Sequence, residues 1–292
     1  MDPTERFNVP DTIVGIGGAG KEVVFQMMSV RDPDDEDGDH NEWIMREVME
    51  PGDGSEGVPN ELLQAFVVET EQEQVKIDVP RCNRINDRIG EMAESYDTAV
   101  YEPEINYINV VEGADVAGHE LVSESVINDF AANTNLNCWW FGGDDIDTKE
   151  NYSNGVVRRR ALGKGLYYAS RAGPDPIHEL VRAADSGTHV DIVVGLGGGT
   201  GSGIFLDLAR ALENDADVEV TLFGIIPKSD EDTDIKANAY AALSELEYLS
   251  LTDQNPFRNI VLLPYGPAED DTGFDEAVVN AILAHCNTRG TN

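Results

Sequence analysis

Two glycine-rich segments are the residues best suited to chemistry in this chain, and the chemistry they suit is the binding of an anion. The richer one reads Gly195-Leu196-Gly197-Gly198-Gly199-Thr200-Gly201-Ser202-Gly203. Glycine lets backbone N–H groups approach a phosphate closely, and the two hydroxyl groups lie beside that nest of donors. A β-branched run at 190–194 precedes the segment and an amphipathic stretch at 200–212 overlaps its end, so it is predicted to join a strand to a helix. The N-terminus of such a helix favours negative charge.

The second segment lies near the start of the chain and reads Val14-Gly15-Ile16-Gly17-Gly18-Ala19-Gly20-Lys21. It is also predicted to join a strand, at 11–16, to a helix, at 19–28. Read literally, it has the GxGxxG spacing of a dinucleotide-binding loop, which expects an acidic residue about 20 positions later, at the end of the second strand. Here the next clear strand ends much further on, at Glu69. Two loops that clasp one polyphosphate are therefore the simpler interpretation.

The elements that must position these loops alternate along the chain. Further strands are predicted at 64–68, 106–111, 138–141, 218–226 and 260–263. Further helices are predicted at 42–49, 159–170, 177–184, 235–249 and 274–285. Strands that alternate with helices indicate an α/β fold with a mostly parallel sheet, covered by helices on both faces.

The charge balance limits the environment and the partners. The chain has 56 Asp and Glu residues against 20 Lys and Arg residues, a formal net charge of -36. Such self-repulsion strains a compact fold unless concentrated salt screens it. The acids are spread over the whole chain, so adaptation to high intracellular salt is favoured over an acidic tail. This charge disfavours binding to nucleic acid or to anionic membranes.

Neither a membrane span nor a secretory signal is visible in the sequence, and the expected location is the cytoplasm. The cysteines, Cys82, Cys138 and Cys286, form no CxxC pair and indicate reduced thiols. The acidic run at 32–40 has some features of a calcium loop, but its glycine is displaced and a proline interrupts it. A solvated loop is the better interpretation.

The Gly-Gly-Gly-Thr-Gly-Ser-Gly run at 197–203 resembles the signature loop of the tubulin/FtsZ superfamily. The resemblance implies a Rossmann-like parallel sheet flanked by helices, GTP or GDP with Mg²⁺, and a nucleotide at a head-to-tail contact between subunits. It implies one nucleotide-binding domain over 1–292, with insertions near 31–60 and 77–135 and without the family's second domain. Association with itself or with a tubulin/FtsZ-like homologue is the expected partnership.

The same resemblance assigns the nucleotide-binding residues. The first phosphate loop holds Gly15, Gly17, Gly18, Ala19, Gly20 and Lys21, and Lys21 is a cation that could face phosphate. Glu69 and Thr70 correspond to the second loop. Arg158 and Arg159 lie in the third, γ-phosphate-sensing loop, where the run 158–160 either contacts phosphate or pairs with local acids. The signature loop supplies Gly197, Gly198, Gly199, Thr200, Gly201 and Ser202.

The base-binding positions depart from the family pattern. Phe274 matches the aromatic residue that stacks on guanine at the start of the central helix. Val278 stands where a hydrogen-bonding reader of the base is expected, and Tyr265 stands where the family has another base-reading residue, an asparagine. Asp275 or Asn280 could compensate. We therefore expect a purine nucleotide with relaxed selectivity for guanine.

No catalytic residue and no metal ligand is assigned. In the family, an Asn-x-Asp-x-x-Asp loop after the central helix enters the neighbouring subunit and positions the attacking water, and this chain ends at 288–292 before such a loop. Binding with weak or absent hydrolysis is expected. Two alternatives remain: a nucleotide-free or regulatory scaffold of the same fold, and an NAD- or FAD-dependent Rossmann enzyme.

Overall fold

The computed structural model describes residues 8–30, 41–49, 63–97, 100–110, 156, 158–171, 176–184, 188–265 and 271–289. The strand predicted at 138–141 and the acidic run at 32–40 lie outside these residues. So does most of the expected insertion at 31–60 and the part of the second insertion from 111 to 135. The expectation of one domain with two insertions therefore stays a prediction.

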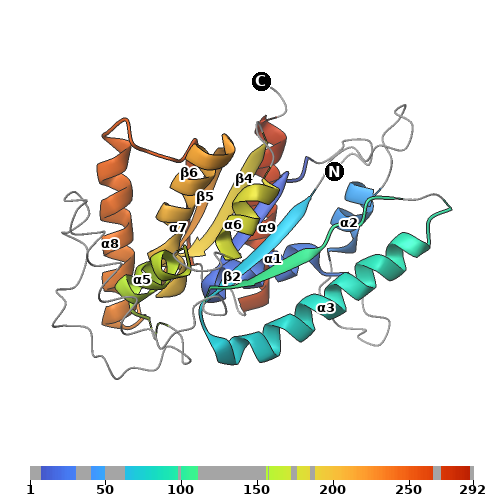
Figure 1. Ribbon diagram of the computed structural model, residues 1–292, viewed down its shortest axis with the longest axis horizontal. Helices are drawn as coiled ribbons and strands as arrows, with labels where there is room; N and C mark the ends of the chain where they lie inside the picture. The colour runs from blue at the N-terminus through green and yellow to red at the C-terminus, as the bar shows by residue number, and fades with distance from the viewer. Residues whose placement is uncertain are drawn as a thin grey trace.

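A six-stranded parallel sheet forms the centre of the described structure (Figure 1). Its strands are β1 (Thr12–Ile16), β2 (Gln64–Glu69), β3 (Ile105–Asn109), β4 (His189–Gly195), β5 (Glu219–Ile226) and β6 (Asn259–Pro264). Their spatial order is β3-β2-β1-β4-β5-β6, and every neighbouring pair is parallel. The predicted Rossmann-like α/β fold is confirmed. The chain reverses its direction across the sheet between β1 and β4, where open α/β sheets bind ligands.

Helices cover both faces of the sheet. One hydrophobic cluster packs α5 (Arg160–Arg171), α6 (Pro176–Ala183), α7 (Thr200–Ala211) and α8 (Thr233–Ser250) against one face. The other cluster packs α1 (Gly17–Met28), α2 (Glu42–Met49), α3 (Gln72–Glu94) and α9 (Asp271–Arg289) against the opposite face. A π-helical turn, η4 (Leu212–Ala216), ends α7. Because both faces are covered, the central strands are buried throughout, as in the run Thr12–Ile16.

The sequence analysis did not predict α3. Residues 77–94 were interpreted as part of an insertion, yet α3 and β3 contribute directly to the cover and the edge of the sheet. The helix buries only a narrow stripe that includes Cys82, Ile89 and Ala93, and it continues through Pro80. A proline and a mostly polar surface hide a helix from an analysis based on apolar spacing.

In the described part of the chain, no helix combines the length and the apolar character needed to cross a membrane.

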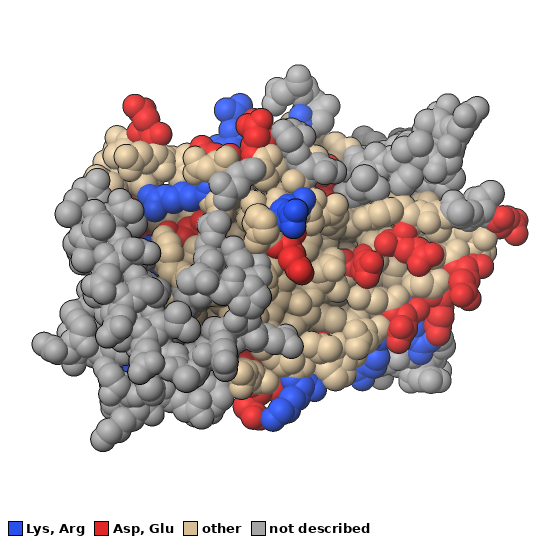
Figure 2. Space-filling view, viewed as in Figure 1, with Lys and Arg blue, Asp and Glu red and all other residues tan. Residues whose placement is uncertain are grey.

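Figure 2 shows acidic side chains along the face that carries α3 and β3. Exposed acids of α3 and the residues after it include Glu73, Asp87, Glu91, Glu94 and Asp97.

Candidate functional site

The two glycine-rich loops meet at the carboxyl edge of the sheet. Strands β1 and β4 are neighbours, with Ile16 opposite Val194, so the loops that follow them begin side by side. A Cβ atom added to Gly17 would lie 3.1 Å from the Gly201 nitrogen and 3.3 Å from the Thr200 Cβ atom. Gly17 also has a φ of 68°, which other residues rarely adopt. The expected convergence of the two loops is confirmed.

Both loops lead directly into helix N-termini that lack side-chain caps. Helix α1 follows Ile16 and helix α7 follows Gly199, and neither of these N-cap residues makes a side-chain hydrogen bond to its helix. The first N–H groups of a helix have no partner within the helix. Two such ends in contact, each with the positive end of a helix dipole, form a favourable place for a polyphosphate.

The glycines of these loops divide into two kinds. A side chain at Gly15, Gly20 or Gly201 would collide with neighbouring backbone or side-chain atoms, so packing alone requires glycine there. Gly18 has no atom within 4 Å of an added Cβ, and at Gly198 the nearest atom is 3.6 Å away. Both residues are exposed, one on each loop. Packing gives no reason for glycine at these two positions, whereas the close approach of a ligand does.

The third expected loop packs against the signature loop. A Cβ atom on Gly199 would lie 2.8 Å from the Arg159 nitrogen. The Asn238 side-chain amide of α8 donates to the Arg158 carbonyl oxygen at 2.6 Å and to the Gly197 carbonyl oxygen at 3.1 Å. The sequence offered no signal for this role of Asn238, because it depends on how α8 packs across the two loops.

The three consecutive arginines have different surroundings. Arg158 is exposed, has a φ of 59°, and its Nη1 lies 2.9 Å from the Asp232 carboxylate. Arg160 is buried, pairs with the Glu245 carboxylate of α8, and donates from Nε to the Ser202 carbonyl oxygen at 2.9 Å. Arg159 is exposed beside Gly199. Pairing with local acids therefore describes Arg158 and Arg160, and contact with phosphate stays a prediction for Arg159.

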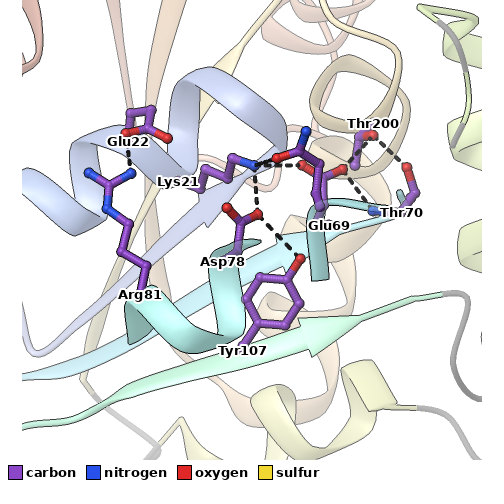
Figure 3. A network of polar contacts seen from close by, with 9 residues as sticks. Lys21, Glu22, Glu69, Thr70, Asp78, Arg81, Tyr107 and Thr200 are labelled. Carbon is purple, nitrogen blue, oxygen red and sulfur yellow. Dashed lines mark hydrogen bonds and ion pairs between the residues drawn. The ribbon is translucent and has the colours of Figure 1, made fainter. Parts of the chain in front are cut away.

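Glu69 connects the second loop to the signature loop (Figure 3). Its Oε1 accepts the Thr70 backbone N–H at 2.8 Å and the Thr200 hydroxyl at 3.3 Å. The hydroxyl oxygens of Thr70 and Thr200 are 2.6 Å apart. Because Thr200 gives its only hydroxyl proton to Glu69, Thr70 is the donor in that contact. Glu69, Thr70 and Thr200 therefore lie together, and their contact with a nucleotide stays a prediction.

Lys21 lies on the other side of Glu69 (Figure 3). Its Nζ is 2.6 Å from Asp78 Oδ2, 3.1 Å from Gln74 Oε1 and 3.7 Å from Glu69 Oε2. The lysine and both carboxylates are buried. An ammonium has three N–H donors, and three acceptors surround this one. Lys21 is thus held by β2 and α3 in this structure, and a direct bond to phosphate stays a prediction.

Burial raises the pKa of the Glu69 carboxyl above its ordinary value of 4.5, and the Thr70 N–H, the Lys21 ammonium and the Thr200 hydroxyl oppose that shift. Between pH 4.5 and the folded-state pKa, the folded protein therefore binds more protons at this site than the unfolded chain does. The free energy of unfolding must fall as the pH rises through that window.

We expect Glu69→Gln to remove this pH dependence. The stability of the original protein relative to the variant should decline as the pH rises above 4.5, as measured by denaturant titration in concentrated KCl. Glu73→Gln, on the exposed surface of α3, is the matched control and should keep the original pH profile. Identical profiles for Glu69→Gln and the unmodified protein would contradict the assignment.

The expected base-binding positions lie in the first turns of α9 and directly after β6. Phe274 is 6% exposed, and its ring stacks on Tyr265, with ring centroids 4.1 Å apart and planes at 20°. The Lys228 ammonium lies 4.1 Å from the Tyr265 ring centroid. Val278 is buried one turn further along the helix. Phe274 thus lies in the first turns of the helix, as expected. The ring that stacks on it is Tyr265 of the same chain.

No group of three or more His, Cys, Asp or Glu side chains in the described ranges could hold a metal ion. The oxygen atoms of Thr70, Thr200 and Glu69 are the metal-compatible groups at the loop junction. A magnesium ion commonly uses one or two protein oxygens together with phosphate oxygens and water, which fits this sparse set.

Comparison with known proteins supports the class that the fold and loops define. Residues 157–271 match the model of a family described as "Tubulin like". This segment contains the third loop, the signature loop and the strands β4 to β6. The match confirms the resemblance to the tubulin/FtsZ superfamily.

Several solved structures are similar to the chain. CetZ2 from Haloferax volcanii, in a GTPgS-bound protofilament, is 18% identical; the alignment covers 94% of this chain and 55% of that chain, with a TM-score of 0.48. TubZ of Bacillus thuringiensis serovar israelensis, in a GTPyS-form protofilament, is 12% identical, with 94% and 55% covered and a TM-score of 0.48. The chain spans about half the length of these proteins. A search of curated protein sequences gave no match.

Proposed function

We propose that this chain binds GTP or GDP, with the phosphates at the junction of the β1–α1 loop and the β4–α7 loop. The observation that carries the proposal is the pair of exposed glycines, Gly18 and Gly198, which have room for a side chain and lie on loops that touch. The uncapped starts of α1 and α7 supply N–H donors beside them. The match of 157–271 to a tubulin-like family supports a guanine nucleotide as the ligand.

Magnesium accompanies the nucleotide in this proposal. Thr200 donates its hydroxyl proton to Glu69 and Thr70 donates its own to Thr200, so the remaining lone pairs of both hydroxyl groups are acceptors. Together with the Glu69 carboxylate, these hydroxyl oxygens are better placed to bind a cation than to bind a negatively charged phosphate oxygen. The ion would supply positive charge that neutralises the phosphates.

Hydrolysis is proposed to be slow in this chain alone. Glu69 is the carboxylate placed at the junction of the loops, but Oε1 already accepts two hydrogen bonds and Oε2 faces Lys21. A general base must be within reach of the proton that it removes and must have a free acceptor for it. By the resemblance, the water-activating acids would come from a neighbouring subunit.

Self-association, or association with a tubulin/FtsZ-like homologue, follows from the same proposal. A head-to-tail contact uses two different surfaces of each subunit and builds a filament when its rotation does not close. With a net charge of -36, such contacts require screening by salt. We propose a cytoplasm rich in salt as the setting, without a role for nucleic acid.

A second candidate function is a nucleotide-free or regulatory scaffold of the same fold. The observation that favours it is the stack of Tyr265 on Phe274, since the chain's own ring covers the residue that would hold the base. An NAD- or FAD-dependent enzyme has less support, because the tubulin-like match includes the signature loop.

Calorimetric titration in multimolar KCl with Mg²⁺ tests the proposal. We expect saturable binding of GTP and GDP, weaker binding after removal of Mg²⁺ with a chelator, and no binding of NADH or FAD. The absence of binding by any purine triphosphate, in a sample shown to be folded by circular dichroism, would favour the scaffold instead.

A further inference from the structure

Tyr265 has both faces of its ring covered. It directly follows β6, and its backbone N–H donates to the Ile226 carbonyl oxygen at 3.0 Å, which fixes where the side chain begins. Phe274 stacks on one face at 4.1 Å. The Lys228 ammonium, also 4.1 Å from the ring centroid, must lie over the other face, since the stacked ring leaves no space for it on the first.

Phe274 offers no open face either. Its ring is 6% exposed and belongs to the hydrophobic cluster of α1, α2, α3 and α9. Tyr265 covers one face of the ring, and Val278 and its cluster neighbours pack within the same core. A base therefore cannot stack on Phe274 while Tyr265 stays in this position.

The aromatic pair lies close to the proposed phosphate site. Lys228 follows Pro227, whose Cγ atom is 3.4 Å from a Cβ atom added to Gly197 in the signature loop. Ala19 of the first loop packs against the same hydrophobic cluster as Tyr265 and Phe274. A nucleotide held by the two loops would therefore bring its base toward this pair.

We propose that Tyr265 is a gate that lowers nucleotide affinity: its ring occupies the base-stacking face of Phe274, Lys228 holds it there, and a nucleobase must displace it. The inference rests on the proposed nucleotide binding. Every base has a π-face that stacks on aromatic rings, and each base that stacks on Phe274 must first offset the contacts that Tyr265 gives up. This cost belongs to the protein, so it lowers the affinity for every nucleotide whose base enters and leaves a triphosphate without a base unaffected.

The test compares three probes, GTP, CTP and inorganic triphosphate, on the folded chain in concentrated KCl with Mg²⁺. Tyr265→Ala should bind GTP about 10-fold more tightly, the combined size of an aromatic stack and a cation–π contact. It should bind CTP more tightly by the same factor or a smaller one, because the cost of displacing Tyr265 is equal for both bases and cytosine stacks more weakly. Binding of inorganic triphosphate should not change, because this probe has no base.

Matched variants separate the gate from general effects. Tyr265→Phe keeps the ring and should behave like the original protein, and Lys228→Met should shift GTP affinity in the same direction as Tyr265→Ala by a smaller factor. Tyr240→Ala, at an exposed tyrosine of α8, should change none of the three affinities. If Tyr265→Ala does not fold, Lys228→Met carries the test.

The outcomes distinguish the two proposals. Failure of inorganic triphosphate to bind either the original protein or the variants would overturn nucleotide binding and the gate with it. Triphosphate binding together with unchanged or weakened GTP binding in Tyr265→Ala would overturn the gate alone, and weakened binding would make Tyr265 a direct contact of the base.

Discussion

Arg160→Met is expected to lower the free energy of unfolding by about 3–5 kcal/mol, the usual cost of leaving one partner of a buried ion pair without the other. The side chains of Arg160 and Glu245 are 8% and 6% exposed. Arg160 also donates to the Ser202 carbonyl oxygen, in the first turn of α7. The substitution would leave a charged carboxylate and a carbonyl oxygen without their partner, between α5, α7 and α8.

Two further variants separate this effect from a general loss of positive charge. Arg158→Met removes an arginine whose side chain is 59% exposed and whose partner Asp232 is 77% exposed, so it should change stability by about 1 kcal/mol or less. The double variant Arg160→Met/Glu245→Leu should recover much of the loss, since no buried charge remains. Denaturant titration in concentrated KCl measures all three. Equal losses for Arg158→Met and Arg160→Met would refute the assignment of Arg160 to the protein interior.

The structure also shows which arginine of the run 158–160 could contact phosphate. From sequence, Arg158 and Arg159 were assigned to the nucleotide site by resemblance, because a run of like residues does not itself show which member faces inward. In the structure, Arg160 opens α5 and is directed to α8, and Arg159 is exposed beside the signature loop. If one of them contacts phosphate, Arg159 is the one that the fold places for it.

The architecture could be predicted because its signal is local. Most strands of the sheet are short apolar runs, and β1 and β4 end where glycine begins a helix or a turn, at Ile16 and Gly195. Parallel strands buried on both faces give this pattern wherever they occur. The order of the strands depends on more than local signals, and it was not predicted from the sequence.

The parts that could not be predicted depend on contacts between distant segments. Asp78 lies in a polar helix that apolar spacing did not reveal, so its pairing with Lys21 was invisible from sequence. From sequence, Lys21 is a cation that could face phosphate, whereas in the structure its ammonium lies against Asp78, Gln74 and Glu69. The stacking of Tyr265 on Phe274 also joins two separate elements, so the sequence did not reveal it. From sequence, Tyr265 stands only at the position of a base-reading residue.

The second large effect is expected from Gly18→Ala and Gly198→Ala, which should each weaken GTP binding by at least about 100-fold without lowering stability. A methyl group at either position meets no protein atom within 3.5 Å, so the fold can accept it. It would, however, stand where phosphate oxygens approach the backbone. Loss of two charge-assisted hydrogen bonds, at about 1.5–3 kcal/mol each, corresponds to a reduction of this size.

The chain provides controls for both halves of this expectation. Gly90→Ala, in α3, also meets no atom within 4 Å; it should leave GTP binding unchanged and increase stability by about 0.5–1 kcal/mol, as alanine does in a helix interior. Gly20→Ala, two residues after Gly18, would place its methyl group against the Val193 carbonyl oxygen and should destabilise the fold by about 1–3 kcal/mol. Thermal melts and GTP titrations of the four variants therefore separate glycines that the fold needs from glycines that the ligand needs. If both Gly18→Ala and Gly198→Ala bind GTP as well as the original protein, the phosphates must lie elsewhere. A phosphate group close to the backbone at this junction would collide with at least one of the two methyl groups.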